Sequence, residues 1–180
     1  SNFDRNTLLA VAASLEKQSE HPLAEAIYKA AEAESLGLHE VSNFSAIPGH
    51  GVQGTINNVV YYLGNRKLVT DVLKLSVNTI ENQMVRLEEQ GKTAMVLAYK
   101  GGVVGFVAVA DTVKETSGQA VASLQKMGIE VYMITGDNQR TAQAIARQVG
   151  ITNVLAEVLP EDKANEVKKL QQLGKKVAMV

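Results

Sequence analysis

The sequence of 180 residues contains no cysteine and only three histidines, at positions 21, 39 and 50. Without cysteine the chain can have no disulfide bond, no thiolate nucleophile and no cysteine-ligated metal. Three histidines so far apart in the sequence also argue against a histidine-based zinc site. We therefore predict no metal site formed by the residues of this chain.

The sequence also lacks an excess of charge of either sign and any long apolar run. The 18 basic and 19 acidic side chains give a net charge of -1, which argues against a surface for nucleic acid or anionic membrane. No apolar run approaches the roughly 18 residues that cross a bilayer, and the N-terminus lacks a signal-peptide pattern. With 46% hydrophobic residues, the chain is expected to be soluble and cytoplasmic, with a packed core and no nucleic-acid partner.

The first 110 residues mix helical and strand-like patterns. Two hairpin turns are expected, at Asn57-Asn58, where asparagine tolerates positive φ, and at Lys100-Gly101-Gly102. The order of the elements predicts an α+β domain, a meandering antiparallel sheet with flanking helices. The periodicity predicts helices over 6–17, 22–37, 65–73 and 77–90, and strands over 41–47, 52–64, 93–99 and 103–110.

After residue 110 short apolar strands alternate with helices, which predicts parallel βαβ units and an α/β domain. The boundary between the two domains is expected near 109–113. Three strands are few for such a sheet, so the chain is expected to be a fragment of a longer protein. The predicted helices span 113–127, 138–149 and 161–173, and the predicted strands span 129–134, 153–157 and, as a buried parallel strand, 177–180.

The stretch Ser19-Glu20-His21-Pro22-Leu23-Ala24 joins the first two helices. Pro22 suits the first position of a helix, because its missing N–H has no intrahelical partner there. His21 would then stand at or beside the helix N-cap, where its imidazole can point at a ligand rather than into the core. The alternative is a turn histidine that caps its own helix.

Glycines gather at two predicted strand ends. Residues 48–54, Pro-Gly-His-Gly-Val-Gln-Gly, contain G-x-G-x-x-G, but the dinucleotide-binding interpretation requires a helix after it, and a hairpin pattern follows instead. The glycines therefore indicate either a β-bulge with positive φ or a close approach of backbone to a flat ring. Gly64-Asn65 fits a strand end, with Asn65 as the cap of the next helix.

Polar residues follow two predicted strands of the second domain. Thr135-Gly136-Asp137-Asn138 lies between a strand and a helix, where backbone N–H groups and the helix dipole favour an anion such as phosphate. The alternative is that Asp137 caps the helix. Lys163 opens another helix, against the dipole preference, which an adjacent anion would explain. Compensation of Lys163 by Glu161 and Asp162 is the alternative.

Taken together, these stretches resemble the heavy-metal (class IB) P-type ATPases, in particular the ATP-binding region of a bacterial copper-transporting member. The likeness covers essentially the whole chain, because six short motifs occur in the family's order and spacing. It implies a nucleotide-binding domain at 1–110 and part of a haloacid-dehalogenase-like (Rossmannoid) phosphorylation domain at 111–180. The motifs are 19–24 (SEHPLA), 48–51 (PGHG), 64–65 (GN), 111–114 (DTVK), 135–138 (TGDN) and 160–163 (PEDK).

The resemblance also implies roles for individual residues, with ATP as the ligand and Mg²⁺ as its ion, whose principal ligands lie outside this chain. Thr135, Asp137 and Lys163 would face the γ-phosphate and the phosphorylated aspartate, and Asp111 would lie in the hinge between the domains. The expectation that the transported ion is copper rather than zinc rests on Gly64-Asn65 followed by Arg66-Lys67. The implied pocket for adenine and ribose consists of Glu16, His21, Gly49, Gly51, Gly64 and Asn65.

Two family stretches are absent from the sequence: Asp-Lys-Thr-Gly-Thr, which carries the phosphorylated aspartate, and Gly-Asp-Gly-x-Asn-Asp, which binds Mg²⁺. They are expected before Ser1 and after Val180. The resemblance therefore implies a cytoplasmic piece of an integral membrane transporter for Cu(I), which binds ATP without turning it over. Its partners would be the transporter's own transmembrane and actuator domains and the transported ion.

Three other interpretations remain open. A zinc, cadmium or cobalt exporter of the same class would carry the same motifs. A haloacid-dehalogenase-type phosphatase would need a paired-aspartate nucleophile stretch, which the sequence does not contain. A non-enzymatic module could dock on another protein through the first domain's sheet. The first domain offers little positive charge for a triphosphate, so ATP is expected to bind mainly through its adenosine end.

Overall fold

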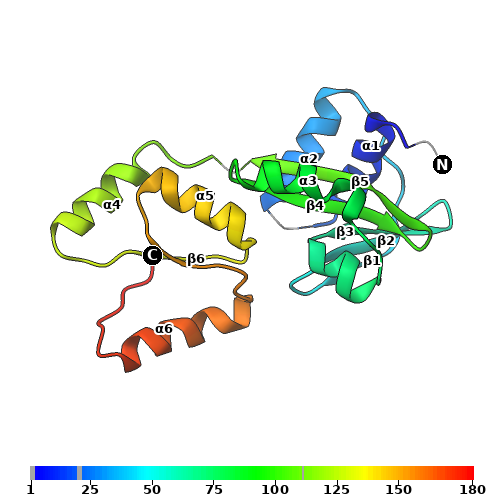
Figure 1. The fold of residues 1–180 in the computed structure, drawn as a ribbon. Helices are drawn as coiled ribbons and strands as arrows, with labels where there is room; N and C mark the ends of the chain where they lie inside the picture. The colour runs from blue at the N-terminus through cyan, green and yellow to red at the C-terminus, as the bar shows by residue number, and fades with distance from the viewer. Residues whose placement is uncertain (1–2, 20–21, 111) are drawn as a thin grey trace. The chain divides into compact units, whose positions relative to one another are not determined.

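A computed structural model describes residues 3–19, 22–110 and 112–180. The chain divides into two compact units, residues 1–111 and 112–180, each with its own sheet (Figure 1). His21 and Asp111, which the sequence analysis singled out, lie outside the described residues. Within the described ranges, every helix falls short of the length and apolar character that a membrane span requires.

The first unit is built on a five-stranded antiparallel sheet in which each strand pairs with the next along the chain. Asn57 and Asn58 take φ values of 49° and 63°, which allow the two-residue turn between the second and third strands. The predicted meander is therefore confirmed. Its strands are β1 Ser42–Ile47, β2 Gly51–Ile56, β3 Val59–Gly64, β4 Lys92–Tyr99 and β5 Gly102–Ala110.

Helices cover both faces of this sheet. Helices α1 (Arg5–Glu16) and α2 (Pro22–Ala33) share a core with Leu63 and Leu97. Helix α3 (Asn78–Glu88) and the preceding turn share a second core with Val96. Leu97 and Val96 are adjacent in β4 and face opposite sides, as the two-residue period of a strand requires. The sheet is therefore the middle of three layers.

Two elements of the first unit differ from the prediction. The α-helix expected over 65–73 is instead a π-helix at Leu68–Val72, in which the Leu73 N–H donates to the Leu68 carbonyl at 3.0 Å. The helix expected to reach Gly37 ends at Ala33, because Ser35 takes a φ of 53° and leaves the helical conformation. Sequence periodicity does not distinguish a π-helical turn from an α-helical one, because the two differ by one residue in hydrogen bonding.

The second unit contains one parallel βαβ unit with a helix on each side of it in the sequence. Strands β6 (Tyr132–Ile134) and β7 (Asn153–Leu155) pair in parallel, and α5 (Gln139–Val149) connects them. The predicted parallel alternation is confirmed, although both strands are shorter than expected. The remaining elements are α4 (Ser117–Lys126), the 3-10 turn η2 (Pro160–Asp162) and α6 (Lys163–Gln172).

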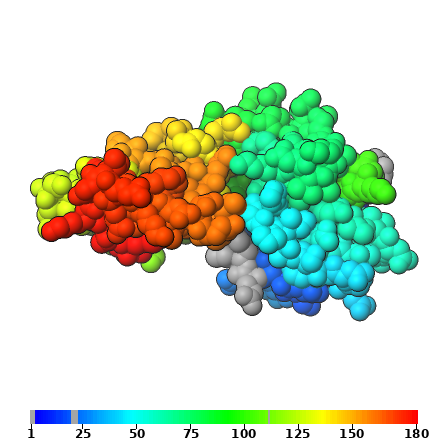
Figure 2. Space-filling view, turned by 90° about the horizontal axis from the view of Figure 1, so that it is seen from below, coloured from blue at the N-terminus to red at the C-terminus, as the bar shows by residue number. Residues whose placement is uncertain are grey.

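The prediction of a buried strand over 177–180 is wrong. These residues form no strand and pair with no other strand of the described residues. Met179 and Val180 are exposed, and Figure 2 shows the C-terminal residues, in red, at the surface of the second unit. An apolar run of this length becomes a strand only when a neighbouring strand satisfies its backbone, and the described part of the chain supplies none there.

Candidate functional site

Two glycines hold the ends of β2 and β3 close together. Gly51 and Gly64 are paired across these strands. A Cβ atom on Gly51 would lie 2.2 Å from the Leu63 carbonyl oxygen, and one on Gly64 would lie 2.1 Å from the His50 carbonyl oxygen. Neither position can accept a side chain without moving backbone, so both glycines serve contact between strands. Gly49 takes a φ of 71°, in keeping with the predicted positive φ.

Asn65 joins the turn before β2 to the turn after β3. Its backbone N–H donates to the His50 carbonyl at 2.8 Å, and its side-chain Nδ2 donates to the Gly49 carbonyl at 2.8 Å. Its Oδ1 accepts from the Leu68 N–H at 3.0 Å, as expected of a helix cap. The structure therefore brings together four of the predicted site residues, Gly49, Gly51, Gly64 and Asn65, which are called the glycine turns below.

His50 lies within the glycine turns and was not predicted as a site residue. Its Nδ1 is 2.9 Å from the Pro48 carbonyl oxygen. A carbonyl can only accept, so this contact is a hydrogen bond only when Nδ1 carries the proton, which leaves Nε2 of the neutral ring as an acceptor. The contact was not foreseeable, because it depends on how the turn closes.

Glu16 is the last residue of α1 and is buried, with 3% of its surface exposed. Burial of a carboxylate is costly unless polar groups surround it, so its position indicates a role beyond solubility. Its predicted companion His21 falls in the segment that is not described. The structure thus places Glu16 in the core of the first unit and does not test the predicted pair.

Thr135 and Asp137 form a closed hydrogen-bonded loop after β6. The Thr135 hydroxyl donates to Asp137 Oδ2 at 2.8 Å and accepts from the Asp137 N–H at 3.1 Å. The alternative that Asp137 caps α5 is wrong, because Asn138 is the N-cap and its Oδ1 accepts from the Thr141 N–H at 3.0 Å. One oxygen of the Asp137 carboxylate instead accepts from the Thr135 hydroxyl.

Three backbone bonds continue the pairing of β6 with the segment after β7. The Thr135 N–H donates to the Leu155 carbonyl at 2.9 Å, the Val158 N–H to Thr135 at 3.0 Å, and the Glu157 N–H to Asp137 at 2.9 Å. These bonds fix the Thr135–Asp137 loop against the chain that leads to α6. Ligands of parallel sheets bind at the edge where strands end, and this loop lies there.

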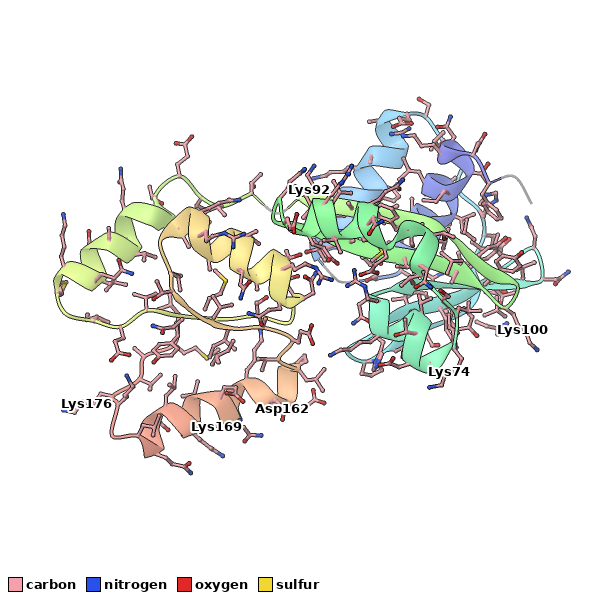
Figure 3. All side chains as sticks on the ribbon, viewed as in Figure 1. Lys74, Lys92, Lys100, Asp162, Lys169 and Lys176 are labelled. Atoms are coloured by element: carbon pink, nitrogen blue, oxygen red, sulfur yellow. The ribbon has the colours of Figure 1, made fainter. Side chains whose placement is uncertain are left out.

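Lys163 is the first residue of α6 and follows Asp162, which Figure 3 labels at the start of that helix. It is partly exposed and makes no ion pair with any residue the structure describes. The carboxylate of Asp162 instead accepts from Asn165 Nδ2 at 3.3 Å. No contact supports the alternative that Glu161 or Asp162 compensates Lys163. A cation at the positive end of a helix dipole is unfavourable, and an adjacent anion would offset it.

The described residues do not fit a self-contained magnesium site. Nowhere in the described ranges do three or more histidine, aspartate or glutamate side chains gather so that they could hold a metal ion. Asp137 supplies one carboxylate, already hydrogen-bonded to Thr135, whereas Mg²⁺ requires near-octahedral oxygen coordination. Any Mg²⁺ bound here would depend on oxygen atoms from elsewhere.

Comparisons of sequence agree with the motifs. Residues 3–180 match the family described as haloacid dehalogenase-like hydrolase. The chain is 50% identical over 175 residues to a copper-exporting P-type ATPase of Staphylococcus aureus (strain JH9), which covers 97% of this chain and 22% of that protein. The chain thus spans 22% of the length of the curated relatives it matches.

Comparisons of structure lead to the same class of protein. A crystal structure of a zinc-transporting PIB-type ATPase in the E2.Pi state is 29% identical, with a TM-score of 0.59 over 96% of this chain and 28% of that chain. The catalytic domain of the CPx-ATPase CopB-B has a TM-score of 0.69 at 22% identity, covering 97% of this chain and 60% of that chain, and shows the fold alone. The resemblance to P-type ATPases is therefore confirmed.

Proposed function

The chain belongs to the haloacid dehalogenase-like hydrolase family, and from this premise we propose that it is the ATP-binding part of a P-type ATPase that exports Cu(I). Residues 1–110 are the nucleotide-binding domain, and residues 111–180 are part of the phosphorylation domain. The 50% identity to a copper-exporting P-type ATPase supports both the class and the metal. The transporter's transmembrane and actuator domains and the exported ion are the proposed partners.

The glycine turns are the observation that carries this proposal. At Gly51 and Gly64 the space of a side chain is filled by backbone of the facing strand, which holds the turns together, and Gly49 leaves exposed backbone there for a flat base to approach. Asn65 holds the turns in register through its bonds to His50 and Gly49. These residues bind the adenosine end of ATP, and Glu16 with His21 orients it.

Thr135, Asp137 and Lys163 handle the phosphate end. The hydroxyl of Thr135 is oriented by its two bonds with Asp137, and the ammonium of Lys163 offsets phosphate charge. Asp111 lies in the hinge. The sequence contains no Asp-Lys-Thr-Gly-Thr stretch, so the 180-residue chain binds ATP without turning it over. Magnesium enters as the ion of ATP, and its principal protein ligands belong to other parts of the transporter.

Zinc is the second candidate for the exported ion. The observation in its favour is the structural likeness to a zinc-transporting PIB-type ATPase at 29% identity, against 50% sequence identity to a copper exporter. Metal choice depends on the ligands along the transport path, and this chain has no cysteine among its residues to offer a soft metal. The higher sequence identity therefore makes copper the first candidate for the exported ion.

An NMR titration of the ¹⁵N-labelled chain with ATP and with AMP tests the proposal. We expect both nucleotides to shift the amide signals of Gly49, Gly51, Gly64 and Asn65 with similar affinity, because binding rests on adenosine. The amides of Gly101 and Gly102, in the β4–β5 hairpin, serve as the control and should not move. Signals that move only in residues 112–180, or only with ATP, would contradict an adenosine site on the glycine turns.

A further inference from the structure

Arg66 directly follows the glycine turns and reaches α3 through its guanidinium. Nε lies 2.9 Å from Glu81 Oε2, and the two terminal nitrogens lie 3.2 Å and 3.3 Å from the two carboxylate oxygens of Glu88. The contact with Glu88 is therefore bidentate, a geometry that arginine offers and lysine does not. Both glutamates belong to α3, which follows the π-helical turn in the sequence.

The contact between Arg66 and Glu88 is largely buried. The side chain of Glu88 is 1% exposed, that of Arg66 is 23% exposed and that of Glu81 is 34% exposed. Burial alone would lower the pKa of Arg66, but the hydrogen bonds to Glu88 and Glu81 outweigh it and raise that pKa. A carboxylate buried as deeply as Glu88 is costly without hydrogen-bond donors beside it, and Arg66 supplies two, so the arginine side chain is held in one place.

The backbone of Arg66 is tied to the same region. Its carbonyl accepts from the Thr70 hydroxyl at 3.1 Å, inside the segment that becomes π-helical at Leu68–Val72. That segment ends before Lys74, labelled in Figure 3, which takes a φ of 56°. A π-helical turn is rare and persists only where surrounding contacts impose it. Arg66 thus lies between a fixed helix on one side and Asn65 on the other.

We propose that Arg66 is a positioning residue for the nucleotide site. By holding residue 66 against Glu88 and Glu81 of α3, it sets the orientation of Asn65, which in turn places Gly49 and His50. Its guanidinium faces α3, so it acts through the turn and makes no contact with the nucleotide. This inference rests on the proposed ATP-binding function.

The test compares Arg66→Lys with the wild-type chain. Lysine keeps the charge but loses the bidentate contact, so we expect ATP and AMP to bind about fivefold more weakly in calorimetry, by the same factor for each. Without nucleotide, the amide signals of Gly49, Gly64 and Asn65 should shift, whereas those of Gly101 and Gly102 should not. A merely structural role would not confine the shifts to the glycine turns.

Arg86→Lys is the matched control, because Arg86 is also on α3 but is exposed. It should leave both affinities and the turn amides unchanged. Glu81→Gln is the second variant, because it removes one charged partner of Arg66 and leaves the buried Glu88 in place. It should weaken the binding of both nucleotides about twofold, which is a smaller loss in the same direction as that of Arg66→Lys.

The outcomes separate this inference from the proposed function. If Arg66→Lys binds ATP as the wild type does, the positioning role is overturned while ATP binding stands. A larger loss for ATP than for AMP would mean direct contact with phosphate, which also overturns it. If the wild-type chain binds neither nucleotide, the proposed function fails and this inference fails with it. If Arg66→Lys does not fold, unchanged affinity in Glu81→Gln overturns the inference.

Discussion

The glycine turns of the first unit and the Thr135–Asp137 loop of the second unit are both strand-end loops joined by hydrogen bonds, yet they present opposite chemistry. The glycine turns offer the exposed backbone of Gly49 and one amide side chain, Asn65, with no charge of their own. The second loop offers a hydroxyl and a carboxylate. A neutral flat base suits the first surface, and a phosphate with its water or ion suits the second.

The comparison of these two loops separates affinity for the nucleotide from the chemistry of its phosphate. Under the proposed function, the first unit supplies most of the binding free energy for ATP, and the second contributes groups that act once phosphate is transferred. Each surface is preorganised in its own way, the first by the close backbone contact that its glycines permit and the second by side chains that bond to each other. Substitutions in the two loops should therefore have different consequences.

The largest contrast is expected between alanine at Gly64 and alanine at Gly136. Gly64→Ala places a Cβ 2.1 Å from the His50 carbonyl oxygen, whereas the nearest atom to a Cβ on Gly136 is 3.5 Å away. We expect Gly64→Ala to lower the free energy of unfolding of the first unit by about 3 kcal/mol and Gly136→Ala to change the second by less than about 1 kcal/mol. Urea unfolding followed by NMR signals of each unit measures both, and equal effects would contradict the contrast.

A smaller effect is expected from Asn65. Asn65→Ala removes two side-chain hydrogen bonds, and we expect a loss of about 2 kcal/mol in unfolding free energy together with weaker ATP binding. Asn65→Asp is the control, because its oxygen can still accept from the Leu68 N–H while the donor to Gly49 is lost. Weakened ATP binding in Asn65→Asp, with most stability kept, would show that the bond to Gly49 orders the site. Full ATP affinity in both variants would contradict that role.

His21→Gln tests the segment that joins α1 to α2. If the imidazole orients adenosine, ATP should bind about tenfold more weakly, or roughly 1.4 kcal/mol. His39→Gln serves as the matched control, because no site role is proposed for His39. Calorimetry at constant Mg²⁺ measures both, and unchanged affinity in His21→Gln would remove His21 from the site.

Asp137→Asn should barely affect nucleotide affinity, because under the proposed function binding rests on the adenosine end. Asparagine keeps an oxygen that can accept from the Thr135 hydroxyl, so the loop should stay closed. We expect the dissociation constant for ATP to change less than about twofold. A tenfold change in calorimetry would show that the Thr135–Asp137 loop contributes to binding, and the contrast between the units would fail.

The smallest effect concerns how each unit caps a helix. The Thr7 backbone N–H donates to the Asp4 carboxylate at the start of α1 and holds the pKa of Asp4 below its ordinary value of 3.8. Asp4 therefore stabilises the first unit above pH 3.8 and loses this contribution as the pH falls through the folded-state pKa. Asn138 caps α5 without titrating. In urea unfolding, the destabilisation by Asp4→Ala should shrink between pH 7 and about pH 3, whereas that by Asn138→Ala should persist.

Short-range chemistry made most of the fold predictable. Asn57-Asn58 predicted the turn between β2 and β3, and alternating helices and strands predicted the parallel pair β6 and β7. The failures arose where tertiary contacts decide the outcome. The π-helix at Leu68–Val72 depends on its neighbours, and residues 177–180 pair with no strand among the residues that the structure describes.

The sequence predicted a set of candidate site residues, of which the structure brings Gly49, Gly51, Gly64 and Asn65 together, but it did not predict the contacts that join them. The motifs selected Gly51 and Gly64, yet the reason for glycine, the contact between the two strand backbones, appears only once the register is known. Capping was assigned to Asp137 as an alternative, but the neighbouring Asn138 caps α5. In the sequence, Arg66 bears only on the choice between copper and zinc. Its contacts with Glu81 and Glu88 become visible only in the folded structure.

The bonds that join the glycine turns all lie within residues 48–68, whereas Glu16 reaches the first unit's core from a helix far earlier in the sequence. Closing a short loop costs less chain entropy than closing a long one, and local contacts form sooner. We therefore expect the hydrogen bonds of the glycine turns to form early in folding and the buried carboxylate of Glu16 to reach its place late. Fraying of α1 would then leave a recognisable but weakened nucleotide surface.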